Sequence, residues 1–253
     1  NLMMAGVWLF RPSTISPWVR RSLHLHHHKV SGTSADIEER GITNGVAWGL
    51  KRLLMMGDHM LSIYLRPLDT LRMMRAYLRS QEPLSTAERR RIIRANLLAY
   101  FPLGMLHYAL WHGWVLWHAF KWMATAIGHA PELSAMQLHL ESTVDFLAVV
   151  LLMPNVLRVF CLHFVSSNMH YYGDVEPGNV VQQTQVWNAW WLAPLHAFCF
   201  NFGATHAIHH FVVRDPFYIR QWTAYRMYPL MREHGVRFND FGTFARANRF
   251  ATV

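Results

Sequence analysis

Two long apolar stretches stand out in a chain that is otherwise basic. Residues 95–123 contain one formal charge, Lys121, and residues 143–165 contain only Asp145 and Arg158. Each stretch is long enough to cross a bilayer as a helix, which takes about 20 residues. The pattern predicts an all-α integral membrane bundle in which two spans form a hairpin.

The remaining sequence has helical spacing but does not reach the length of a span. Leu2–Phe10 is too short to cross a bilayer, and residues 18–29 predict a basic helix. Residues 45–78 have the spacing of amphipathic helices that lie on a membrane surface. Residues 186–202 are rich in tryptophan and predict a helix at the membrane interface.

Composition agrees with a membrane protein. Hydrophobic residues make up 52% of the 253 residues and charged residues 15%, whereas about a quarter of residues are charged in a soluble domain. The net charge of +9 does not indicate a nucleic-acid partner, because a nucleic-acid reader would not carry this much apolar sequence. Cys161 and Cys199 lie in apolar segments and predict buried thiols rather than a disulfide framework.

The distribution of basic residues predicts the topology. Of 24 lysines and arginines, 15 lie in residues 1–94 and 7 in residues 214–249. The positive-inside rule therefore places both flanks in the cytoplasm and the loop of residues 124–142 outside. We expect one domain over residues 1–253, with a cytoplasmic helical cap from residues 11–94 and 166–253.

Histidines are grouped in two clusters with the same H-x-x-H-H spacing. His24, His27 and His28 form the first, and His206, His209 and His210 form the second. On a helix this spacing puts the first ring one turn from the other two, so that the rings share a face. Both clusters are on the cytoplasmic side, and neutral imidazoles suit iron, copper or zinc. Six rings exceed a four-ligand zinc site and predict a site for two metals.

Other histidines give one further candidate ligand and one alternative reading. His170 follows the second span and is expected to reach both clusters, with His163 seven residues earlier on the same face. His107, His112 and His118 lie in the first span, where they could ligate haem in a membrane cytochrome. A scaffold that keeps the histidines without catalysis is a third reading.

These motifs resemble the histidine boxes of the membrane fatty acid desaturase and hydroxylase superfamily of non-haem di-iron enzymes. Residues 18–29 are similar to the second box, and the segment after it, with Thr33, Ala35 and Asp36, is similar to acyl desaturases. His206, His209 and His210 match the third box. The stretch from His170 to Gly173 is similar to the histidine-tyrosine-glycine motif of alkane hydroxylases.

The sequence departs from the family pattern at two points. The first box, H-x(3–4)-H, is absent, and we expect it upstream of Asn1. Acyl desaturases carry an asparagine four residues before the single histidine, where this chain has Ser166. Desaturation is therefore the first expectation, while hydroxylation and oxidative decarboxylation of a fatty acid to a terminal alkene stay open.

The resemblance implies a cofactor, a substrate and partners. Two iron ions would activate O2 against a C–H bond of a fatty acyl chain, with electrons from a separate ferredoxin, rubredoxin or cytochrome b5 that docks on basic residues such as Arg89–Arg91. The enzyme would lie in a bacterial inner membrane. An apolar tunnel between the spans is expected to hold the chain, lined by Phe101, Leu106, Trp111 and Trp114. Four side chains are expected around the ligand rings: His163, Asp36, Ser166 and Asn168.

Overall fold

The computed structural model describes residues 2–10, 16–31, 83–170, 175–176 and 178–246, together with six positions between 36 and 78. This part of the chain is helical, and its extended pairing is limited to two isolated β-bridges, His170 to Thr184 and Val186 to Phe238. The predicted all-α class is confirmed for these residues. Most of the predicted surface helices of residues 45–78, and residues 171–173, lie outside the described residues.

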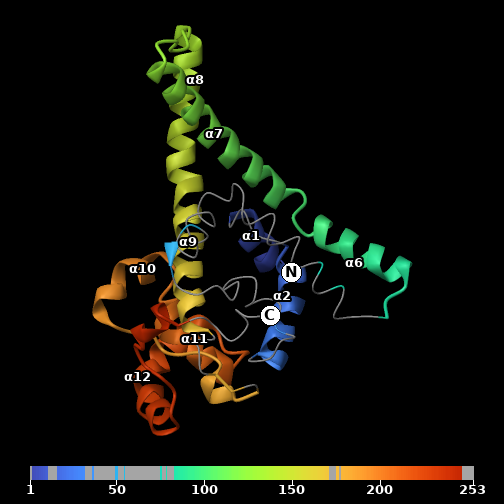
Figure 1. The fold of residues 1–253 in the computed structure, drawn as a ribbon, viewed down its shortest axis with the longest axis vertical. Coiled ribbons are helices and arrows are strands. Elements are labelled where there is room, and N and C mark those ends of the chain that lie inside the picture. The colour runs from blue at the N-terminus through green and yellow to red at the C-terminus, as the bar shows by residue number, and fades with distance from the viewer. Residues whose placement is uncertain are drawn as a thin grey trace. The chain divides into compact units, whose positions relative to one another are not determined.

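The chain divides into two compact units, which are residues 1–20 with 86–157, and residues 21–85 with 158–253. The first unit contains α1 (Leu2–Phe10), α6 (Thr86–Leu98), α7 (Leu103–Ala126) and α8 (Ala135–Leu147), which are labelled in Figure 1, and the π-helical turn η1 (Ala148–Leu152). Helix α2 (Pro17–Val30) begins in the first unit and continues into the second. It confirms the basic helix predicted for residues 18–29.

One continuous helix runs from Ala135 to Met169 through α8, η1 and α9 (Met153–Met169). Among the described residues it alone is long and apolar enough to cross a membrane. At 35 residues it measures about 52 Å. Pro154 explains the π-turn before it, because proline cannot donate to the carbonyl of Val150 and its ring would clash there. The predicted span of residues 143–165 lies inside this helix.

The predicted span of residues 95–123 is not a single helix. Helix α6 ends at Leu98, residues 99–102 form a turn, and α7 begins only at Leu103. Pro102 has no N–H to continue the hydrogen-bonding pattern, which explains the break. Within the described chain, α7 does not reach the apolarity of Ala135–Met169, since three histidines and Lys121 lie in it.

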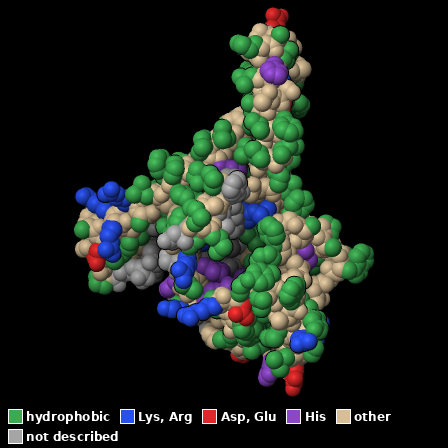
Figure 2. Space-filling model, turned by 180° about the vertical axis from the view of Figure 1, so that it is seen from behind, with side chains coloured by type: hydrophobic (Ala, Val, Ile, Leu, Met, Phe, Trp, Pro, Cys, Tyr) green, Lys and Arg blue, Asp and Glu red, His purple; other side chains and the backbone are tan. Residues whose placement is uncertain are grey.

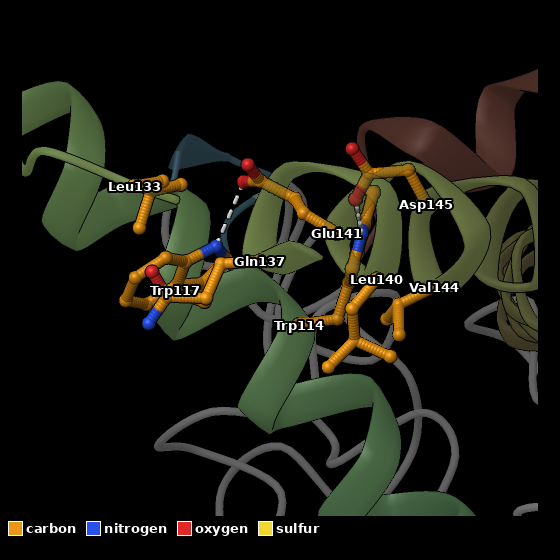
Figure 3. A pocket seen from close by; sticks show the side chains of 8 residues that line it. All are labelled: Trp114, Trp117, Leu133, Gln137, Leu140, Glu141, Val144 and Asp145. Atoms are coloured by element: carbon orange, nitrogen blue, oxygen red, sulfur yellow. Dashed lines mark hydrogen bonds between the residues drawn. The ribbon is translucent and has the colours of Figure 1, made fainter. Parts of the chain in front are cut away.

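Helices α7 and α8 form a hairpin that is held by polar contacts within the first unit. The indole N–H groups of Trp114 and Trp117 donate to Asp145 and Glu141 over 2.9 and 2.8 Å (Figure 3). His118 and Lys121 approach the same two carboxylates. These four side-chain contacts between the two helices fix the register of the pair.

The outer faces of this hairpin are apolar. Several large hydrophobic side chains of α7 and α8 are more than half exposed: Leu116, Phe120, Met123, Leu138 and Phe146. Figure 2 shows hydrophobic surface along this hairpin. Contact of such a surface with lipid is favourable, whereas its exposure to water costs free energy. It fits the membrane setting that the composition predicts.

The second unit contains η2 (Val180–Gln182), η3 (Trp190–Leu192), α10 (Ala193–Phe198), α11 (Phe202–Phe211), α12 (Phe217–Glu233) and η4 (Phe241–Phe244). Residues 186–202 thus form η3 and α10 rather than one interfacial helix. One buried cluster contains Cys161, Val165 and Trp187, and another contains Val186, Ile208 and Met231. Both cysteines are free and buried, as predicted.

Candidate metal centre

Helix α2 carries the first histidine cluster on one face. His27 is 1% exposed, and His24 and His28 are half-buried, whereas His26 is exposed. This division follows from helix geometry, because positions i, i+3 and i+4 share a face and the residue between them does not. The sequence-based choice of three of these four histidines agrees with their burial.

A first triad of ring nitrogens joins α2 to α11. His24 Nε2 lies 2.9 Å from His209 Nε2, His28 Nε2 lies 2.8 Å from His209 Nε2, and the two α2 nitrogens are 3.2 Å apart. The two sequence clusters, separated by about 180 residues, therefore meet as predicted.

A second triad joins the end of α9 to α11. His170 Nε2 lies 3.1 Å from His206 Nε2 and 3.3 Å from His210 Nε2, and the two α11 nitrogens are 3.1 Å apart. All three rings are at least nine-tenths buried. His170, the candidate found outside the two clusters, thus completes one of the two triads.

His27 lies between the triads. Its ring centroid is 5.1 Å from that of His28 and 5.2 Å from that of His210. One ligand nitrogen from each of these three residues falls within 4.8 Å of the others. Its Nδ1 is 2.8 Å from Asp36 Oδ2, and both side chains are buried. Because a carboxylate only accepts, the hydrogen is on Nδ1 and the Nε2 of His27 keeps a lone pair for a metal.

Two more ring orientations are fixed by oxygen acceptors. His170 Nδ1 lies 3.1 Å from the carbonyl oxygen of Ser166, and His210 Nδ1 lies 2.9 Å from Gln183 Oε1. Each Nδ1–H donates to its acceptor, so that both Nε2 atoms present lone pairs toward each other over 3.3 Å. Two facing lone pairs repel unless a cation lies between them.

The donor set fits metal ions. A neutral imidazole nitrogen offers one N–H or one lone pair in a single direction, so three converging Nε2 atoms cannot satisfy one another. A metal with bonds of about 2.1 Å to nitrogen and right angles between them separates neighbouring nitrogens by about 3.0 Å. The observed separations of 2.8–3.3 Å match this value.

Burial keeps these rings neutral. It lowers the pKa of His206 and His210 well below the usual value, and the charges that neighbouring histidines would carry lower it further. Burial also lowers the pKa of His209 to about 3, with Arg220 as the next cause. Metal ions bind the neutral form of imidazole, so the three α11 histidines are held in the state that ligates.

Sequence reasoning missed two neighbours of the site. Gln183 lies beyond η2, and its only sequence signal is a polar run, Gln182–Thr184, between apolar segments. Phe202 opens α11, and its ring stacks on His206 with centroids 4.0 Å apart. An aromatic residue one turn before a ligand is common in helices, so this position carried no signal.

Other predicted site residues are placed differently. His163 is half-buried on α9 and does not belong to any of the close histidine groups found among the described residues. The side-chain amide of Asn168 donates to the Phe164 carbonyl of its own helix over 2.7 Å. Ser166 does contact His170, through its carbonyl and its hydroxyl.

The four residues predicted for a tunnel divide into two pairs. Trp111 is buried and its ring lies 5.3 Å from that of Trp114. Trp114 lines an apolar pocket of about 270 Å³ between α7 and α8 (Figure 3). Phe101 and Leu106 are 63% and 55% exposed. The described part of the first unit therefore supports an apolar cavity at Trp114 but does not place all four side chains along it.

Two of the three histidines considered for haem contact protein oxygen atoms within the hairpin. His118 Nε2 lies 2.8 Å from Asp145, and His112 Nδ1 lies 2.6 Å from the Tyr108 carbonyl. These contacts agree with a hydrogen-bonding role within the hairpin.

Comparison with known proteins gives one finding. The sequence model of a family described as fatty acid desaturase matches residues 1–242. The comparisons with curated proteins and with solved structures found no match.

Proposed function

Because the chain belongs to the fatty acid desaturase family, we propose that it is an O2-dependent, non-haem di-iron oxidase that desaturates a fatty acyl chain. Family membership makes it an oxidoreductase of lipid metabolism. The observation that carries the di-iron proposal is the pair of triads, in which six Nε2 atoms converge in two sets.

The proposed ligands divide between two ions. His24, His28 and His209 would hold one iron, and His170, His206 and His210 the other, with the Nε2 of His27 available between them. Bound iron would supply the activation of O2 that removes hydrogen from an unactivated C–H bond. Imidazole binds metal ions in its neutral form, so seven such ligands would hold the two ions without neutralising their charge.

The surrounding residues hold the ligand rings in place before the substrate arrives. Asp36, the Ser166 carbonyl and Gln183 each accept an Nδ1–H and so fix the tautomer and the direction of one ring. Partners of this kind are worth about 10–100-fold in metal affinity. The Phe202 ring covers His206 and helps to exclude water from the second triad.

We also propose the membrane setting and the electron supply. Helix Ala135–Met169 would span the bilayer, α7 would pair with α8 as a second span, and the histidine-bearing unit would face the cytoplasm of a bacterial inner membrane. A separate ferredoxin, rubredoxin or cytochrome b5 would deliver electrons. The exposed arginines of α6, Arg89–Arg91, would attract an acidic donor.

Metal analysis and lipid mass spectrometry test the function together. Full-length protein purified from expressing cells should contain two irons per chain, and the cells should accumulate an unsaturated acyl product. His209→Ala should abolish both, whereas His26→Ala, which removes an exposed ring from the same helix as the first triad, should preserve both.

Each other outcome rejects a specific part of the proposal. A hydroxylated product, or an alkene one carbon shorter than the acid, would replace desaturation by one of the other reactions. A Soret band with haem in place of iron would establish the cytochrome reading. Fewer than two irons together with no oxidised lipid would reject the di-iron oxidase, and loss of activity in His26→Ala would reject the ligand assignment.

A further inference from the structure

A group of side chains of the metal-binding kind lies in the hairpin of α7 and α8, outside both triads. His118 of α7 and Glu141 and Asp145 of α8 each offer one ligand atom, and these atoms lie within 4.8 Å of one another. All three residues belong to the first compact unit, whereas the seven proposed iron ligands belong to the second. The group is therefore separate from the candidate metal centre.

Helix periodicity brings the three ligand atoms together at spacings that suit a metal ion. Glu141 and Asp145 share one face of α8, because positions i and i+4 are neighbours on a helix. His118 Nε2 lies 2.8 Å from Asp145 Oδ1. With bonds of about 2.1 Å, ligand atoms at right angles are about 3.0 Å apart and opposite ones about 4.2 Å apart. Shifts of a few tenths of an ångström in partly exposed side chains would close the group around one ion.

Each carboxylate keeps one oxygen for a cation. Trp114 donates to Asp145 Oδ1, and Trp117 and Lys121 donate to Glu141 Oε1. The other two oxygens, Asp145 Oδ2 and Glu141 Oε2, accept no hydrogen bond from the described residues and are accessible to solvent. Figure 3 shows that both point away from the indole rings. The indoles therefore orient the carboxylates, as outer partners of metal ligands do, without using the oxygens that would bind.

The charge of the hairpin also favours a cation. Residues 103–147 contain one lysine, Lys121, and three acids, Glu132, Glu141 and Asp145, so their formal charge is −2 in a chain of net charge +9. Lys121 balances Glu141, whereas Asp145 is approached by an indole and an imidazole. An unbalanced carboxylate is costly in a membrane helix and is by default a sign of function. One divalent cation would bring the formal charge of residues 103–147 to zero.

The ligand types select the class of cation. Magnesium and calcium prefer sets made of oxygen ligands alone, whereas zinc accepts imidazole and carboxylate together. Three protein ligands leave a fourth position of a tetrahedral zinc ion for water. We propose that His118, Glu141 and Asp145 bind one divalent cation of the zinc type, in addition to the two ions of the histidine triads.

The ion would join the two helices near the turn that connects them. Helix α7 ends at Ala126 and α8 begins at Ala135, so the ligands lie about two turns from each of these ends. The side chains of His118 and Asp145 are 37% and 38% exposed, which lets an ion reach them without separation of the helices. A cation with ligands from both helices would hold the hairpin together more firmly than the hydrogen bonds alone.

Zinc titration of the full-length protein tests the site. Protein freed of metal by a chelator is titrated with zinc in detergent, and the bound zinc is counted by mass spectrometry. The wild type should bind three ions per chain, one in each triad and one in the hairpin. His118→Ala and Asp145→Asn should bind two, with the third weakened by at least about 100-fold, since loss of an outer partner alone costs 10–100-fold. His139→Ala removes an exposed ring of α8 outside the group and should still bind three.

The outcomes separate this site from its alternatives and from the metal centre. Equal zinc binding by wild type and His118→Ala would overturn the proposal and leave a proton on His118 to balance Asp145. Loss of the third ion in His139→Ala as well would show unspecific surface binding and would also overturn it. A wild type that binds a single zinc, lost in His118→Ala, would support the hairpin site while rejecting the triads. Asp145→Asn keeps an acceptor oxygen for Trp114, so it decides the question if His118→Ala does not fold.

Discussion

Gly203 is the position at which the smallest change should have the largest effect on the candidate metal centre. It lies in the first turn of α11, directly against α9 and the segment before η3. A Cβ at this position would lie 2.3 Å from His196 Cε1, 3.0 Å from the Trp187 carbonyl oxygen and 3.1 Å from Val165 Cγ1. Ordinary contacts between carbon atoms are about 3.5–4.0 Å, so Gly203→Ala requires α11 or His196 to move by about 1 Å.

The two possible movements both cost free energy. His196 can move only by weakening its hydrogen bond to the Trp187 carbonyl, and α11 can move only by disturbing the triads. Overpacking of this kind costs about 1–3 kcal/mol, while the better helix propensity of alanine returns at most about 1 kcal/mol. We expect the free energy of unfolding to fall by about 1–2 kcal/mol, or a Tm lower by about 2–8 °C.

A matched substitution isolates the steric cause. Gly113→Ala is also a helix-interior change, in α7, where an added Cβ would meet nothing within 4 Å. Thermal unfolding of the purified proteins in detergent should show a lower Tm for Gly203→Ala and an unchanged or slightly higher Tm for Gly113→Ala. Iron content should fall only in the former. If both variants kept the Tm and the iron content of the wild type, the close packing of α11 against His196 would be refuted.

Three further predictions concern the ligand rings. Asp36→Asn removes the anionic acceptor of a buried ligand and should weaken iron binding by about tenfold in a chelator competition; unchanged affinity would deny Asp36 its orienting role. Gln183→Leu should weaken it by a similar factor, about tenfold, whereas Gln182→Leu next to it should have no effect. Because burial lowers the pKa of His209 from 6.5 to about 3, between these values the unfolded chain binds protons that the folded chain does not. The stability of the metal-free protein should therefore be greatest above about pH 6.5 and decrease as the pH falls toward about 3, and a Tm that stays flat over this range would contradict the burial of the ring.

The sequence was most informative for the histidines that lie on regular helices, because helix periodicity then indicates which rings share a face. The spacing in His24–His28 and His206–His210 determines which rings share a face, because consecutive residues on a helix differ by about 100°. The exposure of His26 beside the buried His27 follows from the same geometry. The prediction that the two clusters meet also rested on charge, because the positive-inside rule assigns both basic flanks to the same side of a membrane.

Other features could not be read from single residues or from composition. Gln183 lies in a non-helical segment, where no periodicity indicates the direction of a side chain. The apolar run of residues 95–123 hides the turn at residues 99–102, since Phe101 and Leu103 are as hydrophobic as the helix that follows. Gly203 is an ordinary residue in the sequence, and only the neighbouring His196 and Trp187 show why a side chain is excluded.

The π-turn at Ala148–Leu152 sets the rotation of the residues that directly follow it, about the helix axis, relative to the hairpin residues before it. A π-turn holds one residue more than a regular turn, and each residue advances a helix by about 100°. Loss of one residue from this turn would therefore rotate the following residues about the helix axis. This rotation would matter more than the loss of length. The hairpin carboxylates Glu141 and Asp145 would keep their direction only if Val156, which is buried one turn after the π-turn, turned away from its own. The length of this segment is thus under a stricter constraint than its apolar sequence, in which one aliphatic residue can replace another.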